Sequence, residues 1–337
     1  MKIIRKEEDV SNKESTFSKK KKQKKNPWGK KERFVIIGIL FLTAFSSAIL
    51  AISARSWKLP GFPKLKAPSF EFEKTYVYEK DIIKKSDENI EKIKEIFKKE
   101  TNKLSGVYAF EVVLLDTNVV FGVNEQTKLQ AASLIKLPVM ALLYEKAQTG
   151  SLDLDYTYTL KNSDKKAGSG SLYSKPEGTK ITYRNLAQLM GKESDNTAFA
   201  IAVDILGEEE IESFIKRVGM YETSLSENTT TPYDIGIFFK KLWSGDILNH
   251  QYKEELLNSL TDTIYEDYLP KGIPEEIDVS HKYGRELHVL NDAGIVRSEP
   301  PFVLVLMSEG IVESEAEKIF PILSRKLYQE ITSLYKI

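Results

Sequence analysis

Ser133 and Lys136 have the residue types and the spacing for nucleophilic chemistry. A serine hydroxyl is a weak nucleophile until a neighbouring base takes its proton. Residues i and i+3 lie on the same face of a helix, so a desolvated Lys136 could serve as that base. The same spacing occurs at 18/21, 163/166, 213/216 and 333/336, but only Ser133 leads into an apolar helical segment, LPVMALL. The spacing alone is a weak signal, and this context favours Ser133 among the five pairs.

A second group, Ser194-Asp195-Asn196, lies within the stretch MGKESDNTAFA. A second hydroxyl near the first could relay a proton to a leaving group, and the Asn196 amide could hold a substrate carbonyl. The structural alternative is a capped helix, in which Ser194 or Asp195 is the N-cap of TAFAIAVDIL.

A third group, His281-Lys282-Tyr283-Gly284, lies on a predicted strand near the end of the chain. A lysine at this place could bind a substrate carboxylate, and Gly284 would let the substrate run close to the backbone. The structural alternative is an ordinary lysine at the edge of a sheet.

The elements that must position these groups follow from the hydrophobic pattern. Two strand-like runs, 107–116 and 119–123, flank Thr117-Asn118, which predicts a hairpin. A helical segment follows over 131–148, and residues 185–260 are predicted to be mostly helical. Nearer the C-terminus the pattern predicts strands near 277–283, 288–296 and 302–308, and then a helix over 314–335. We therefore expect an α+β fold, in which N- and C-terminal strands form one antiparallel sheet flanked by helices, next to a central all-helical lobe.

The N-terminal part predicts a single transmembrane helix. Residues 34–53 carry no charge, and about 20 apolar residues span a bilayer as a helix. The Lys-rich stretch before this run predicts a cytoplasmic N-terminus and an extracytoplasmic body at the cell membrane, with the basic tail against anionic lipid. The alternative is a cleaved signal peptide. The expected organisation is a basic tail (1–33), a signal-anchor (34–54), a stalk with Pro and Lys (55–85) and a catalytic domain (86–337).

Composition excludes several kinds of site. The chain has no cysteine, so disulfides, thiolate metal sites and a cysteine nucleophile are excluded. It has three histidines and no HExxH pair, so a zinc hydrolase is not expected. Residues 1–33 carry 13 Lys/Arg and 5 Asp/Glu, but the membrane explains this tail without a nucleic-acid partner.

The order S-x-x-K, S-D-N, K-x-G resembles the signature of class A β-lactamases and penicillin-binding proteins. The flanking sequences are similar as well. AASLIKLPVM resembles the nucleophile helix of that family, and GSGSLYSKPEGTKITYRNLAQLMGKESDNTA resembles the stretch leading into the second motif. NTTTPYDIG resembles the segment after the Ω-loop, and NDAGIV the strand after the K-T-G strand. The resemblance covers residues 100–330 approximately, most of the expected catalytic domain.

The resemblance implies catalytic roles for four residues. Ser133 would be acylated, with Lys136 as general base or proton shuttle. Ser194 would pass a proton towards the leaving nitrogen. Lys282 would bind the substrate carboxylate and tune Ser194. No metal or organic cofactor is implied.

The resemblance also implies a substrate-binding set. Asn196 would contact the substrate, and Tyr283 and Gly284 belong to the strand along which it lies. The oxyanion hole would use the backbone N–H groups of Ser133 and Arg285, so the identity of the Arg285 side chain need not matter.

Two departures from the family pattern bear on function. Tyr283 stands where the family has Thr or Ser, whose hydroxyl helps to hold the substrate carboxylate, so either the carboxylate is held differently or the substrate differs. Class A β-lactamases also use an Ω-loop glutamate for deacylation. Here the corresponding stretch, GMYETSLSEN, contains only Glu222 and Glu227, and neither stands in an E-x-x-x-N context.

Three functions stay open. The first is a cell-wall acyl-enzyme that attacks a D-Ala-D-Ala-like peptide and passes the acyl group to water or an amine. The second is a β-lactamase with weak or unusual deacylation. The third is a pseudo-enzyme that binds wall polymers or a membrane partner without covalent chemistry.

Overall fold

The computed structural model describes residues 29–56 and 76–335 of the chain. The chain divides into two units, 1–73 and 74–337. In the first unit, the described part is essentially one helix, α1 (Lys30–Ser56), which covers the whole of the expected anchor at 34–54. Within the described ranges, no helix combines the length and the hydropathy of a membrane-crossing segment. The transmembrane helix expected at 34–54 is therefore not confirmed, and most of the expected basic tail and of the stalk lies outside the described residues.

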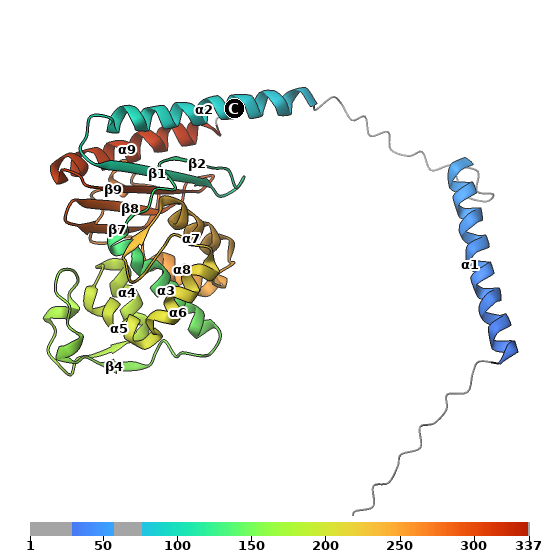
Figure 1. The fold of residues 1–337 in the computed structure, drawn as a ribbon, viewed down its shortest axis with the longest axis horizontal. Coiled ribbons are helices and arrows are strands. Elements are labelled where there is room, and N and C mark those ends of the chain that lie inside the picture. The colour runs from blue at the N-terminus through green and yellow to red at the C-terminus, as the bar shows by residue number, and fades with distance from the viewer. Residues whose placement is uncertain (1–28, 57–75, 336–337) are drawn as a thin grey trace, which may run out of the picture. The chain divides into compact units, whose positions relative to one another are not determined.

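The second unit is built on a five-stranded sheet (Figure 1). Its strands pair antiparallel in the order β2-β1-β9-β8-β7. The hairpin predicted around Thr117-Asn118 joins the first two strands, and β1 pairs along its whole length with β9, from Val107 opposite Glu309 to Leu114 opposite Phe302. The expected pairing of N- and C-terminal strands is confirmed. The strands are β1 (Val107–Leu114), β2 (Val120–Val123), β7 (Val279–Glu286), β8 (Val289–Val296) and β9 (Phe302–Glu309).

Two helices, α2 (Tyr76–Thr101) and α9 (Glu313–Ser333), lie side by side on one face of this sheet (Figure 1). Alternate strand side chains point to this face and form an apolar core with the helices. The rings of Phe97 on α2 and Phe110 on β1 lie 4.6 Å apart, centroid to centroid. The stretch 55–85 was expected to be a stalk. Its backbone is instead helical from Tyr76, where α2 begins.

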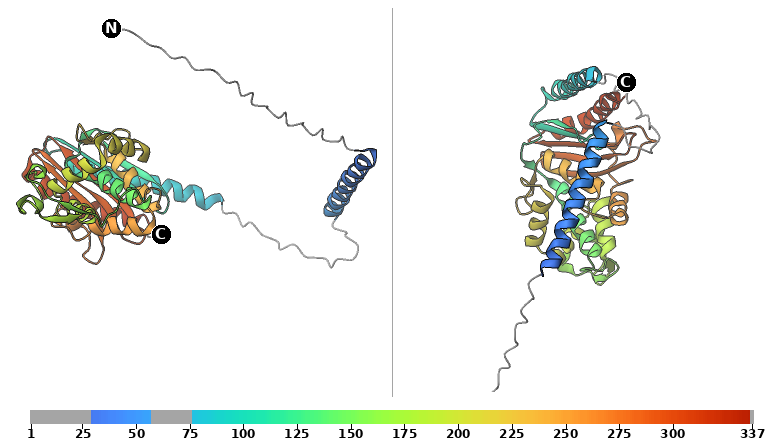
Figure 2. Two further views of the ribbon diagram at one scale, coloured as in Figure 1. Left: turned by 90° about the horizontal axis from the view of Figure 1, so that it is seen from below. Right: turned by 90° about the vertical axis from the view of Figure 1, so that its right-hand side faces the viewer.

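The opposite face of the sheet carries a lobe of six helices (Figures 1 and 2). Its central helix is buried from Lys136 to Tyr144, because its neighbours surround it on all sides. The expected helical lobe is thus present. Its helices are α3 (Lys136–Gln148), α4 (Tyr183–Lys192), α5 (Asn196–Leu206), α6 (Glu208–Val218), α7 (Pro232–Ser244) and α8 (His250–Ser259).

Short elements connect these parts. Two small sheets pair β3 (Leu129–Gln130) with β6 (Thr229–Thr230), and β4 (Thr157–Thr159) with β5 (Lys180–Thr182). The helix expected over 131–148 is divided, because the first part is a 3₁₀ turn, η1 (Ala132–Ile135), and α3 begins only at Lys136. Three more 3₁₀ turns are η2 (Asn162–Asp164), η3 (Leu172–Ser174) and η4 (Pro270–Gly272).

Candidate active site

Ser133 lies on η1, directly before the buried helix α3. The residue before it, Ala132, has a φ of +47°, a left-handed conformation that is unusual for a residue with a Cβ. Ser133 is partly exposed although its neighbours on η1 are buried. The Nζ of Lys136 lies 2.7 Å from the Oγ of Ser133. The i, i+3 pair identified in the sequence is therefore in direct contact.

Lys136 connects the serine to the second motif. Its Nζ donates to the carbonyl oxygen of Ser194 (2.9 Å) and to Oδ1 of Asn196 (2.8 Å), and lies 3.2 Å from the Oγ of Ser194. Its side chain is almost wholly buried. Burial lowers the pKa of Lys136 to about 8, although the carboxylates of Asp195 and Glu286 act in the opposite direction. About a tenth of Lys136 is consequently neutral at pH 7, and this is the form that acts as a general base.

The second motif is both a helix cap and part of the site. Asp195 is the N-cap of α5: its carboxylate accepts from the backbone N–H of Ala198 (2.8 Å) and also from that of Leu172 (2.7 Å). This fully buried anchor holds Ser194 at a φ of +53°. Gly170 has a φ of +91° and packs so closely that a Cβ there would clash with the Asp195 carboxylate. Strain of this kind persists only where the surroundings enforce it, and here it directs Ser194 at Lys136.

Lys282, from the third motif, lies deep under the site. The residue is 1% exposed, and its Nζ donates to the carbonyl oxygen of Tyr283 (3.0 Å). Burial lowers its pKa well below the usual value for a lysine, and the nearby charge of Lys136 acts in the same direction. A lysine so enclosed is poorly placed to present a positive charge to a substrate.

Gly284 brings the edge strand β7 against the nucleophile. A Cβ at this position would lie 3.0 Å from the backbone nitrogen of Ser133 and 3.3 Å from the carbonyl oxygen of Ala131. The glycine thus permits an approach that any side chain would crowd. Arg285 follows it, and both Ser133 and Arg285 line the same hollow.

Tyr283 is part of a stack of three tyrosines. Its ring is stacked on Tyr265, with centroids 4.6 Å apart, and on Tyr268, with centroids 5.0 Å apart. Burial raises the pKa of Tyr283, the neighbouring Tyr268 acts in the same direction, and Arg285 acts in the opposite direction. Tyr265 in turn contacts the hydroxyl of Ser169 at 2.9 Å. Tyr265 and Tyr268 come from the loop after α8, which carries no motif, so the sequence offered no signal for them beyond their aromatic character.

The hollow beside Ser133 has a volume of about 320 Å³. It brings together five of the eight site residues that we expected from the sequence, whereas Lys136, Lys282 and Gly284 are not among its described lining residues. Four lining residues were not expected: Gly168, Ser169, Tyr265 and Glu286. The described lining residues are Ser133, Gly168, Ser169, Ser194, Asn196, Tyr265, Tyr283, Arg285 and Glu286.

The comparisons with known proteins bear on the family and on the fold. A family model described as the β-lactamase enzyme family (Beta-lactamase2) matches residues 89–331, which is most of the chain. This chain belongs to the β-lactamase enzyme family. The search of the curated proteins found no match.

Solved structures share the fold of this β-lactamase family member. PBP-A is 22% identical with a TM-score of 0.68, and the match covers 73% of this chain and 96% of PBP-A. The β-lactamase of Sphaerobacter thermophilus is 23% identical, with a TM-score of 0.68 and coverage of 73% and 97%. An ancestral class A β-lactamase (GNCA) is 20% identical, with a TM-score of 0.66 and coverage of 71% and 99%.

Glu222 and Glu227, the two carboxylates considered for deacylation, both lie exposed on the loop before β6. Glu227 forms an ion pair with Lys128 at 3.5 Å. Neither glutamate is among the described residues that line the hollow beside Ser133.

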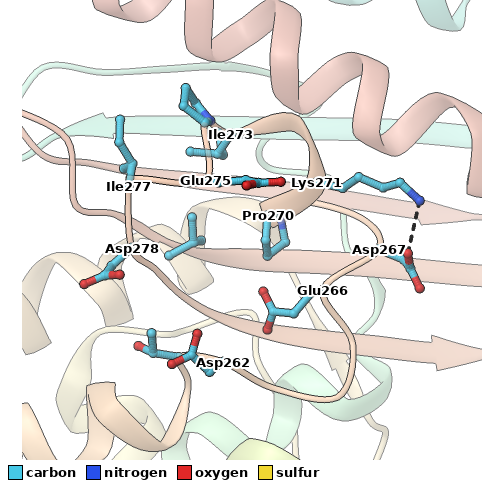
Figure 3. A pocket seen from close by; sticks show the side chains of 12 residues that line it. Asp262, Glu266, Asp267, Pro270, Lys271, Ile273, Glu275, Ile277 and Asp278 are labelled. Carbon is cyan, nitrogen blue, oxygen red and sulfur yellow. Dashed lines mark hydrogen bonds and ion pairs between the residues drawn. The ribbon is translucent and has the colours of Figure 1, made fainter.

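A second hollow of about 360 Å³ is lined by residues of the loop after α8 (Figure 3). Carboxylates from the segment between α8 and β7 line it, and Lys271 pairs with Asp267 there. Glu266, one of these carboxylates, also contacts the buried ring of His281 (3.2 Å). Burial opposes a charge on His281, but Asp292 (2.7 Å) and Glu266 raise its pKa to about 9. His281 therefore connects the loop to β7 and β8.

In the described part of the chain, no cluster of His, Asp or Glu is arranged to hold a metal ion.

Proposed function

We propose that this chain is a serine acyl-enzyme in which Ser133 attacks the carbonyl of a D-alanyl-type cell-wall amide or of a β-lactam. The observation that carries the proposal is the Lys136 contact set: a buried amine lies 2.7 Å from the Ser133 hydroxyl and is held by Ser194 and Asn196. An amine with a lowered pKa beside a serine hydroxyl is the arrangement that nucleophilic catalysis needs.

The steps follow from these positions. Neutral Lys136 takes the proton of Ser133, and the Oγ forms a bond to the substrate carbonyl carbon. The developing oxyanion accepts hydrogen bonds from the backbone N–H groups of Ser133 and Arg285. The proton then passes through Ser194 to the leaving nitrogen, the C–N bond breaks, and the acyl group stays on Ser133 as an ester.

Deacylation is expected to be slow. The hollow contains no glutamate from the loop 220–228 among its described lining residues, and the family's β-lactamases use such a residue to activate water. This favours a cell-wall acyl-enzyme, with β-lactam hydrolysis as the alternative. A point mutant of PBP-A, which shares this fold, has been solved as an acyl-enzyme complex with penicillin G. A binding protein without covalent chemistry is the second alternative.

Intact-protein mass spectrometry with benzylpenicillin tests the proposal. We expect the full-length protein to acquire one adduct that persists for many minutes, and Ser133→Ala to acquire none. Ser163→Ala is the matched control, because Ser163 has a lysine at the same spacing but is exposed and contacts Asp164. An adduct that forms and clears quickly would instead indicate a β-lactamase. The absence of any adduct at all times would contradict an acyl-enzyme.

We also propose that α1 anchors the protein in the cell membrane, with the N-terminus in the cytoplasm. Support comes from the uncharged run 34–53, from the basic stretch before it and from the large apolar side chains that α1 exposes, which are Phe34, Val35, Ile37, Ile39, Leu40, Phe41, Leu42 and Phe45.

Fractionation of cells that express the full chain tests this anchor. We expect the protein to stay with the membranes through a high-salt wash and to be released by detergent. A variant without residues 34–54 should leave the membrane fraction. Release of the full chain by salt alone would contradict the anchor and would indicate attachment through the basic tail.

A further inference from the structure

The hollow beside Ser133 offers little to a substrate carboxylate. A carboxylate in a binding site is ordinarily met by an arginine or lysine, or by several hydrogen-bond donors. Among the described residues that line the hollow, Arg285 is the only cation. Binding of a substrate carboxylate therefore depends on whether the Arg285 guanidinium is free to form an ion pair with it.

Arg285 is already engaged by two carboxylates of α9. Its Nη1 donates to Glu317 at 2.9 Å and its Nη2 donates to Glu313. Both ion pairs are partly exposed, so each is individually weak, but together they orient the guanidinium towards α9. The positive charge at the hollow is thus neutralised by two negative charges on the neighbouring helix.

Two groups of the third motif, Lys282 and Tyr283, are held by their neighbours in the fold, although Tyr283 lines the hollow. Lys282 is buried and donates to the backbone of Tyr283. The ring of Tyr283 is stacked on both Tyr265 and Tyr268. Neither side chain can turn towards a ligand without breaking these contacts.

Glu286 adds a negative charge to the same wall. It is exposed at the end of β7, lines the hollow and lies close enough to act on the charge of Lys136. A carboxylate at this place repels a second carboxylate and attracts an ammonium group.

We infer that the amide cleaved at Ser133 carries no free carboxylate on its leaving side, so that the leaving group is an amine whose neighbouring carbon bears no carboxylate, unlike a terminal D-alanine. The inference rests on the proposed function. In the acylation step the Ser133 Oγ–carbon bond forms and the C–N bond breaks. The serine proton, carried through Lys136 and Ser194, leaves with the amine, and the amine then takes a second proton from water. The resulting ammonium lies next to Glu286 instead of next to a competing cation.

Benzylpenicillin and its methyl ester test the inference, because they share the acyl group and the ring and differ in the one carboxylate. The rate of adduct formation on the full-length protein is measured by intact mass for each compound and divided by the rate of its own alkaline hydrolysis. We expect the corrected rate for the ester to exceed that for the free acid. A corrected rate for the acid that equals or exceeds that for the ester overturns the inference and leaves the proposed function standing. Absence of an adduct from both compounds overturns the proposed function, and the inference with it.

Variants identify the source of the preference. Glu286→Gln should lower the ratio of ester to acid rates by about two- to fivefold, the range for partly exposed charges. The double variant Glu313→Gln/Glu317→Gln frees Arg285 and should shift the ratio towards the acid. Glu227→Gln is the matched control, since this exposed glutamate lies away from the hollow, and should leave the ratio unchanged. A ratio that responds equally to the Glu227 and Glu286 changes would overturn the role of Glu286.

Discussion

Replacement of Lys136 by methionine is expected to slow the acylation of Ser133 by about 10²–10⁴-fold, the usual contribution of a general base. Methionine has a similar volume, so it removes the amine without opening a large cavity. It leaves the acceptors on Ser194 and Asn196 without their donor, so some loss of stability is also expected. The measurement is the rate of adduct formation with benzylpenicillin, together with the melting temperature of each variant.

The matched control is Lys166→Met. Lys166 follows Ser163 at the same spacing, but it is exposed, so this variant should acylate at the wild-type rate. The pH profile of the wild-type protein gives an independent check that requires no variant. Because the pKa of Lys136 is about 8, the acylation rate should rise with pH below that value and level off above it. A rate that is flat from pH 6 to pH 9, or equal losses in both variants, would contradict Lys136 as the base.

Replacement of Glu111 by glutamine is expected to stabilise the protein at pH 9 by roughly 3 kcal/mol. Glu111 is on β1, is 1% exposed and faces α7, where a Cβ at Gly236 would clash with its Oε1. Among the residues that the structure describes, neither of its carboxyl oxygens has a hydrogen-bond partner. Burial first, and then the charges of Glu125 and Asp234, raise the pKa of Glu111 to about 8.

The sign of the pH dependence follows from this raised pKa. Between about pH 4.5 and pH 8, the folded protein keeps a proton on Glu111 that the unfolded chain releases. The contribution of Glu111 to the free energy of unfolding is therefore at its maximum below pH 4.5 and falls progressively until pH 8. The expected gain is smaller than the full shift implies, since relaxation and water entry soften such penalties.

Urea unfolding at pH 5.5, 7 and 9 measures this effect. The midpoint of Glu111→Gln should exceed that of the wild type by an amount that grows with pH. Glu227→Gln is the exposed control and should follow the wild-type curve throughout. Parallel curves for the wild type and Glu111→Gln would show that Glu111 does not change its ionisation on folding.

Much of the architecture could be predicted because it depends on local patterns. Val107–Leu114 and Val120–Val123 flank a turn, so their pairing follows from short-range geometry. The buried helix after Ser133 is marked by its run of apolar residues, and the order of the three motifs pointed to the family that the match over 89–331 then showed. The boundary of that helix was wrong, because the left-handed φ of Ala132 is imposed by packing and leaves no mark in the residue types.

The sequence by itself determined which residues carry reactive groups and in what order they occur: a serine with a lysine on the next turn, a second serine, and a lysine-glycine strand. The tertiary structure decided which of these groups meet, because contacts between distant segments depend on packing that no local spacing encodes. Lys136 reaches Ser194 and Asn196 across some sixty residues of chain. Arg285 turns to α9, and Tyr283 is enclosed by two tyrosines from a loop without a motif. Because of these contacts, the negative charge of Glu286 acts in the hollow beside Ser133. No pattern in the sequence distinguished Glu286.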